Sequence, residues 1–318
     1  MIGQDAIDHH HSAPASVKAG SVSRAMSWLM GEQAPTLPTD RALAQKLEEA
    51  LPWLAKSLEI KRSFVYHGAR TMNQRLDIDQ FVTMSTGPYL PWPGQHADLQ
   101  LPCDAVPESR VVHVHTLPGT GATSPACNHP HTHAGLPQML PLLRTPTMEV
   151  FDRHRPIGVL VDDIGPWTDS TADLRFGLDR LREWLPPGSA IALIHSTTDL
   201  LPTARQAAVH DRRDRAASLL TEATGRPYSP RSRTEIAKLL APWSLSNVDG
   251  PVATGKFFPD HAHAQLPEHH SGAYAAMALH PSHSDYAKDP NYTPGGPTRG
   301  TERSVPEQGT GEEQAGTS

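Results

Sequence analysis

Two short apolar runs separated by a helical stretch decide the fold: Pro156-Ile-Gly-Val-Leu-Val161 and Ala190-Ile-Ala-Leu-Ile-His195. Each run has the length of one strand and is apolar at nearly every position, which is typical of strands buried on both faces. Between them, leucines recur every three or four residues from Leu174 to Leu185, which predicts one face of a helix. A strand, a helix and a strand in this order predict a parallel pair joined by a helical crossover.

The same alternation extends to both sides of this unit. A long helix is predicted from about residue 204 to 223, and Ser232-Arg-Thr-Glu235 is a capping box that begins another helix. Further strands are predicted at residues 80–84, 110–115, 243–248 and 273–279, the last two as antiparallel edge strands. The chain therefore predicts an α/β fold with a mostly parallel sheet covered by helices on both faces.

The N-terminal part of the chain is expected to be helical. Leucines from Leu43 to Leu58 recur at helical spacing, Pro52 interrupts them, and a second helix is predicted over about residues 57–72. We expect residues 20–76 to form a helical cap on a core of residues 77–283. Residues 1–19 and 284–318 lack an apolar period, and we expect a disordered leader and a disordered tail there.

Composition excludes several classes of protein. The 318 residues carry 28 basic and 34 acidic side chains, a net charge of -6 that disfavours a nucleic-acid partner. The strongest apolar run, Ile157–Val161, is far shorter than the roughly 20 residues that cross a membrane. The two cysteines, Cys103 and Cys127, are too few for a disulfide scaffold, and no secretory signal precedes the chain's first helix. We therefore expect a cytoplasmic protein with no membrane partner.

Four stretches together resemble a known family. They are Ser23–Gly31 followed by Asp40-Arg41, Lys61-Arg-Ser-Phe64, Arg155-Pro156, and Leu185-Pro-Pro-Gly-Ser-Ala-Ile-Ala-Leu-Ile-His-Ser-Thr197. Their order resembles the class I S-adenosylmethionine-dependent methyltransferases, and more narrowly a family found mainly in actinobacteria whose substrates are largely unassigned. The resemblance implies a Rossmann-like core with an N-terminal helical cap. It also implies methyl transfer from S-adenosylmethionine to a small-molecule acceptor.

The resemblance also implies which residues contact the cofactor. The family has Asp-Ile-Gly-Thr-Gly after its first strand, where this chain has Thr83-Met-Ser-Thr-Gly87, and the family's ribose-binding acid is replaced here by His115. The N-terminal cap could close over the ligand through a matching arginine, or that arginine could form an ion pair between helices. The expected cofactor-binding residues are Thr83, Ser85, Thr86, Gly87, His115 and Arg24.

Three residues at strand ends are candidates for catalysis, because ligands bind at the carboxyl ends of parallel strands. His195 matches the family's Ser-His-Ala-Thr pattern and could act as a general base or line the pocket, or it could cap the strand by bonding backbone. Asp162 and Asp163 end the strand of residues 156–161 and could orient the acceptor or remove its proton. Alternatively, the two acids form a solvated turn before Gly165.

Two other functions are consistent with the sequence. The replaced positions in the cofactor loop would suit a degenerate, non-catalytic relative that acts as a binding or regulatory partner. A histidine-rich segment, with ligand-type side chains at Cys127, His129, His131 and His133 and at His113 and His115 upstream, could support metal-assisted chemistry. The spacing of this segment matches no closed zinc motif, so we assign no metal ligands.

Overall fold

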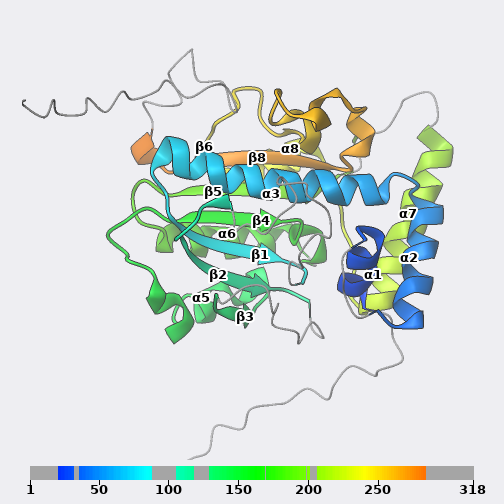
Figure 1. Ribbon diagram of the computed structural model, residues 1–318, viewed down its shortest axis with the longest axis horizontal. Helices are drawn as coiled ribbons and strands as arrows, with labels where there is room; N and C mark the ends of the chain where they lie inside the picture. Colours follow the sequence, from blue (N-terminus) through cyan, green and yellow to red (C-terminus); the bar gives the residue numbers. More distant parts are fainter. Residues whose placement is uncertain are drawn as a thin grey trace, which may run out of the picture.

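The fold is a single mixed sheet with helices on both faces and a group of helices at one end (Figure 1). The computed structural model describes residues 21–31, 36–87, 105–117, 129–168, 170–197, 199–200 and 206–283. The helices are α1 (Val22–Leu29), α2 (Pro38–Ala50), α3 (Leu54–Leu76), α5 (Met139–Leu142), α6 (Thr171–Trp184), α7 (Gln206–Thr224) and α8 (Arg233–Leu240). The strands are β1 (Gln80–Ser85), β2 (Arg110–His115), β3 (His131–His133), β4 (Gly158–Asp162), β5 (Ala190–Ser196), β6 (Ser244–Leu245), β7 (Val252–Ala253) and β8 (Ala273–Leu279).

The sheet confirms the predicted parallel core. Its strand order is β3-β2-β1-β4-β5-β8-β6, with β7 also paired to β8. The five strands from β3 to β5 are parallel, and β8 runs antiparallel to β5 and to β6. Every residue of β1, β5 and β8 is buried, which explains why β8 and most of β5 are apolar rather than alternating. The carboxyl ends of β1, β4 and β5 therefore lie together at one edge.

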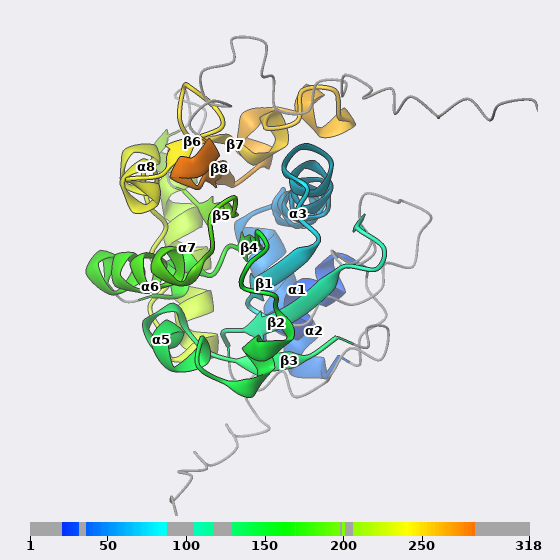
Figure 2. The same cartoon turned by 90° about the vertical axis from the view of Figure 1, so that its left-hand side faces the viewer.

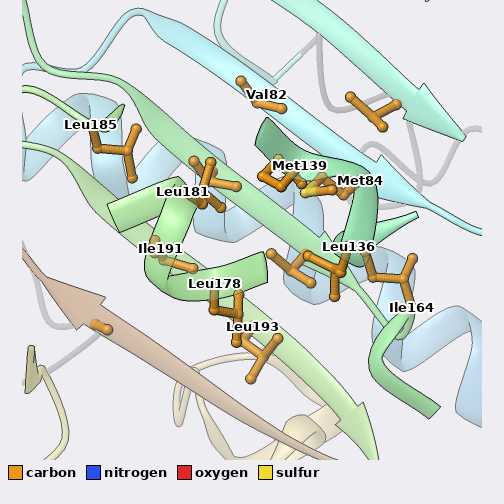
Figure 3. Packing of buried hydrophobic residues seen from close by; sticks show 14 of the residues in the cluster. Val82, Met84, Leu136, Met139, Ile164, Leu178, Leu181, Leu185, Ile191 and Leu193 are labelled. Carbon is orange, nitrogen blue, oxygen red and sulfur yellow. The ribbon is translucent and has the colours of Figure 1, made fainter. Parts of the chain in front are cut away.

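Helices cover the two faces of the sheet unequally (Figure 2). On one face lie α5, α6 and α8. The leucines of α6 that the sequence spacing identified include Leu178 and Leu181, which pack against Ile191 and Leu193 of β5 (Figure 3). On the other face lies α3, whose apolar side packs on β1, β4, β5 and β8. Gly158 allows this close packing, because a Cβ there would lie 2.7 Å from the Phe81 ring and 2.9 Å from Met72 Sδ.

The N-terminal helices divide between two environments. Pro52 separates α2 from α3, as the sequence predicts, but α3 begins at Leu54 and continues to Leu76, beyond the expected segment. Helix α3 belongs to the layer on the sheet, whereas α1 and α2 pack with α7 beyond the strand ends (Figure 1). We call α1, α2 and α7 the cap. Its apolar contacts bring Val22, Leu47 and Leu220 together.

The remaining predicted elements are present, with two corrections: residues 273–279 form β8, which lies between β5 and β6 rather than at an edge, and the strand predicted over 243–248 is only β6 (Ser244–Leu245). Ser232 and Glu235 form the capping box of α8, with Glu235 N bonded to Ser232 Oγ and Ser232 N to Glu235 Oε2. The strand β3 was not predicted, because three residues in a segment rich in Gly, Pro and His give no usable period. The expected leader at 1–19 and tail at 284–318 lie outside the described residues. No helix in the described part of the chain is long and apolar enough to cross a membrane.

The buried carboxylate of Asp40 holds the start of the cap together. Asp40 is fully buried and accepts hydrogen bonds from Ser21 N (2.7 Å), Leu37 N (2.8 Å) and Arg24 Nε (2.6 Å). Burial raises the pKa of this carboxyl, but the hydrogen bonds from Arg24, Leu37 and Ser21 outweigh that effect and hold the pKa below the usual 3.8. Asp40 therefore remains charged and joins α1 to α2.

Replacing this carboxylate tests the role of the bond network. We expect Asp40→Asn to lower the free energy of unfolding by about 3 kcal/mol, because the amide leaves the guanidinium of Arg24 without its charged partner. The matched control is Arg41→Ala on the next residue, which is exposed and, among the residues that the structure describes, bonds Thr36, and it should change stability by less than about 0.5 kcal/mol. Urea unfolding of both variants measures the difference, and equal stability would contradict this role of Asp40.

Candidate active site

One cavity lies between the carboxyl ends of β1, β4 and β5 and the cap. It holds about 1390 Å³ of space between side chains, part of it open to solvent. Its sheet side is lined by Ser85, Thr86, Gly87, Asp162, Asp163, Ser196 and Thr197, and its other walls come mainly from α1, α2, α3 and α7. Ligands of parallel sheets bind at this edge, so the cavity is the candidate active site.

The end of β1 contributes the part of the wall that the sequence assigns to the cofactor. Ser85, Thr86 and Gly87 all line the cavity, and Ser85 Oγ donates a hydrogen bond of 2.6 Å to the Gly87 carbonyl. This bond folds the chain back directly after the strand. Thr83 lies further back in β1, is fully buried, and pairs with His113 Nδ1 at 2.6 Å. Of the four candidates on this segment, three reach the cavity and Thr83 does not.

His115 belongs to a cluster of imidazoles on β2 and β3. It lies opposite Ser85 in the β1–β2 register and is buried, but it does not line the cavity. His115 Nε2 lies 2.8 Å from His131 Nδ1, and the His131 ring stacks on those of His113 and His115. Burial and the neighbouring imidazoles lower the pKa of His113 to about 3 and that of His115 to about 4. His113 and His115 are therefore neutral at pH 7.

The floor of the cavity is an ion pair with hydrogen bonds that connects three elements. Lys61 Nζ of α3 lies 2.6 Å from Asp163 Oδ2, just after β4, and 3.1 Å from Ser196 Oγ at the end of β5. Ser196 donates to the same carboxylate through its backbone N (2.6 Å) and through Oγ (2.7 Å). Asp163 adopts a left-handed conformation, with φ of 52°, a conformation that Asp tolerates better than most residues. The carboxylate thus receives three hydrogen bonds and a positive charge.

Two more polar side chains, Tyr228 and Asp162, line the cavity on and beside this floor. Tyr228 is half-buried, contacts Ser196 through its hydroxyl, and packs against Trp167 with ring centroids 4.7 Å apart. Burial raises the pKa of Tyr228 well above 10, so its hydroxyl stays protonated. Asp162 ends β4, follows the residue that pairs with Met84 of β1, and lines the cavity while half-buried. Asp162 and Asp163 therefore occupy the wall and the floor of one cavity.

His195 lies outside the cavity, on the opposite side of β5 from Ser196. It is fully buried, its Nδ1 lies 2.8 Å from the Ser196 carbonyl, and its Nε2 lies 3.0 Å from Nη1 of Arg231. A carbonyl must accept and a guanidinium must donate, so these partners fix a neutral ring with the proton on Nδ1. Burial lowers the pKa of His195 to about 4. Its contacts are those of a residue that supports the strand end by bonding backbone.

The arginine expected over the cofactor is also outside the cavity walls. Arg24 forms an ion pair with Asp40, as the helix-pairing alternative describes. Arg62, which lies in the Lys61–Phe64 stretch that resembles the family, lines the cavity and is buried. Among the described residues, no group of three or more His, Cys, Asp or Glu side chains could hold a metal ion. Cys127 lies outside the described residues.

Comparisons with known proteins identify the family of the chain. A family model described as S-adenosyl methyltransferase matches residues 8–281. The chain belongs to that family. No curated protein matches it significantly.

Two solved structures are similar to this methyltransferase family member along most of their length. One is a proposed methyltransferase from Thermobifida fusca, with 21% identity, a TM-score of 0.66, and coverage of 83% of this chain and 96% of that one. The other is a DUF574 family protein from Streptomyces avermitilis, with 22% identity, a TM-score of 0.66, and coverage of 82% and 97%. Both likenesses concern the fold, and they confirm the predicted α/β class I methyltransferase-like architecture.

The sequence analysis assigned no role to three residues of the site in this methyltransferase family member. Lys61 and Ser196 occur in stretches that carry the family resemblance, and Tyr228 lies in a loop after α7. Nothing in the sequence shows that Lys61, the eighth residue of α3, faces a carboxylate 102 residues away. The available signal was its position beside Arg62 on a helix that otherwise packs in the core.

The neutral buried histidines predict a loss of stability in mild acid. For His195, the pKa is about 4 in the folded chain and about 6.5 unfolded, so below pH 6.5 the unfolded chain binds the proton and the folded chain does not. This contribution is absent above pH 6.5 and destabilises the fold increasingly as the pH falls towards 4. Between pH 7.5 and pH 5 it amounts to about 2 kcal/mol.

Urea unfolding at pH 7.5 and pH 5.0 measures this loss. We expect His195→Gln to reduce the difference between the two pH values by about 2 kcal/mol. The control His154→Gln, at an exposed histidine, should leave the difference unchanged. If H195Q retained the full pH dependence of the unmodified protein, His195 would not be buried in its neutral form.

Proposed function

We propose that this protein transfers a methyl group from S-adenosylmethionine to a small-molecule acceptor held in the cavity. The observation that carries the proposal is that Ser85–Gly87, at the end of β1, and Asp162, at the end of β4, line the same apolar cavity beneath the cap. When bound, S-adenosylmethionine supplies an electrophilic methyl group on a sulfonium. What remains for the protein is to position the two molecules, exclude water and accept a proton.

The residues present fit the cofactor at two places. Ser85–Gly87 would hold its methionine part, where the turn closed by the Ser85 hydroxyl brings backbone to the cavity wall. Neither ring of the His115–His131 pair lines the cavity, so the ribose would extend past Ser85, the register partner of His115, to reach this pair, where His115 takes the place of the family's acid. His131 Nε2 is buried and has no hydrogen-bond partner among the described residues. It is a donor or an acceptor depending on which ring donates within the pair, and a ribose hydroxyl complements either form.

The two aspartates would have different tasks. Asp163 already accepts bonds from Lys61 and from two atoms of Ser196, so it is a positioning residue that fixes the floor. Asp162 lines the wall beside β1 and is the group that we assign to accept the acceptor's proton. The apolar side chains of the cap exclude water from this space and strengthen the interactions inside it.

His195 and Arg24 would act through other residues. His195 bonds the Ser196 carbonyl and Arg231, and so fixes the chain direction at the point where Ser196 turns towards Asp163. Arg24 fixes α1 on α2 through Asp40 and so shapes the cap side of the cavity. Both are positioning residues in this proposal.

Calorimetry with S-adenosylhomocysteine, the demethylated product, tests the cofactor assignment. We expect binding, and we expect His131→Phe to weaken it about three- to tenfold, because the ring remains but the nitrogen that faces the ribose is lost. His154→Phe, at an exposed histidine, is the matched control and should bind like the unmodified protein. Asp162→Asn should also bind normally, because Asp162 is assigned to the acceptor.

Absence of binding at about 1 mM S-adenosylhomocysteine would contradict the proposal. Together with stoichiometric capture of another protein, that result would favour a non-catalytic relative. If H131F bound as tightly as H154F while its thermal unfolding was unchanged, the ribose would have to lie elsewhere.

A further inference from the structure

The side chains that line the cap side of the cavity suit a flat apolar ligand. The apolar side chains that line it include Met26, Leu47, Leu54, Leu58, Trp167 and Leu220. They come from α1, α2, α3 and α7, together with the short helix Gly165–Trp167. Aromatic faces and the polarisable sulfur of methionine pack well against rings. The walls opposite the strand ends therefore favour an aromatic or otherwise flat apolar ligand.

The charges around the cavity disfavour a cationic ligand. Among the described residues that line it, three are basic and two are acidic: Lys61, Arg62, Arg213, Asp162 and Asp163. The Asp163 carboxylate is already neutralised by Lys61 at 2.6 Å. Burial also lowers the pKa of Arg213, a sign that a further positive charge is poorly solvated on this side. An ammonium group would meet more positive than negative charge and would lose its hydration on entry.

The floor suits a neutral group that both donates and accepts hydrogen bonds. Lys61, Ser196 and Tyr228 lie together there, and Asp162 stands on the adjoining wall. A hydroxyl could accept from one of the donors on the floor and donate to Asp162. An ammonium group has no lone pair with which to accept.

We infer that the acceptor is an uncharged, mainly apolar aromatic molecule that presents a hydroxyl group to the floor formed by Lys61, Asp163, Ser196 and Tyr228. This inference rests on the proposed function for the reaction itself. In the reaction, an oxygen–carbon bond forms as the sulfur–methyl bond of the donor breaks. The electron pair of that bond stays on sulfur, which becomes a neutral thioether, and the hydroxyl proton passes to the Asp162 carboxylate and then to water.

Binding of two probes of matched shape tests this inference without the donor. The probes are 1-naphthol, which is neutral at pH 7.5, and 1-naphthylmethylamine, which is an ammonium ion there. Calorimetry with the full chain should give at least tenfold tighter binding for 1-naphthol. Equal binding of the two probes, or tighter binding of the ammonium, would overturn the inference.

A pair of leucine substitutions tests whether the probe enters this cavity. Leu58 lines the cavity and is half-buried, so Leu58→Trp should fill the apolar space and weaken 1-naphthol at least tenfold. Leu140→Trp places the same side chain at an exposed leucine on α5 and should leave the affinity unchanged. Thermal unfolding confirms that both variants are folded. Unchanged 1-naphthol affinity in folded L58W would also overturn the inference.

Failure of the inference and failure of the proposed function give different results. If S-adenosylhomocysteine binds and 1-naphthol does not, the methyltransferase assignment stands and the acceptor class is wrong. If 1-naphthol binds in the cavity and S-adenosylhomocysteine does not, the ligand class is supported and methyl transfer is excluded.

Discussion

The contact between Lys61, Asp163 and Ser196 is the constraint on which the site depends. It joins α3, the turn after β4 and the end of β5 within a few ångströms, so the face helix and two strand ends share one charged centre. A buried lysine and a half-buried aspartate are costly to desolvate, and their mutual attraction and the serine's two hydrogen bonds offset that cost. The arrangement therefore tolerates little displacement of any of the three elements.

This constraint also explains the shape of the cavity. The left-handed conformation of Asp163 turns the chain sharply after β4 and directs its carboxylate towards α3, while Asp162 remains on the cavity wall. Ser196 faces the same centre, which leaves His195 on the other side of β5, where Arg231 and backbone surround it. The apolar cap then closes the space from the opposite side. The candidate catalytic groups lie on the floor and one wall, whereas the cap side combines apolar side chains with Arg62 and Arg213.

Sequence patterns predicted the architecture well because burial on both faces produces long apolar strands and leucine-rich helices. The crossover around α6, the Pro52 break, the Ser232 capping box and the antiparallel β8 all follow from such local signals. The site was predicted only in part. Ser85–Gly87, Asp162 and Asp163 line the cavity because strand ends converge, whereas His195 and Arg24 engage protein partners instead. Which side of a strand end a residue faces, and which distant lysine meets it, depends on tertiary packing that a local pattern does not encode.

A double-mutant cycle on Lys61 and Asp163 tests the central claim most directly. Lys61→Met, Asp163→Asn and the double variant are compared by urea unfolding with the unmodified protein. Because each single change leaves a buried group without its partner, we predict that the two losses are not additive, with a coupling energy of about 2 kcal/mol or more. Additivity to within about 0.5 kcal/mol would contradict the account, because α3 and the strand ends would then be held independently of this ion pair.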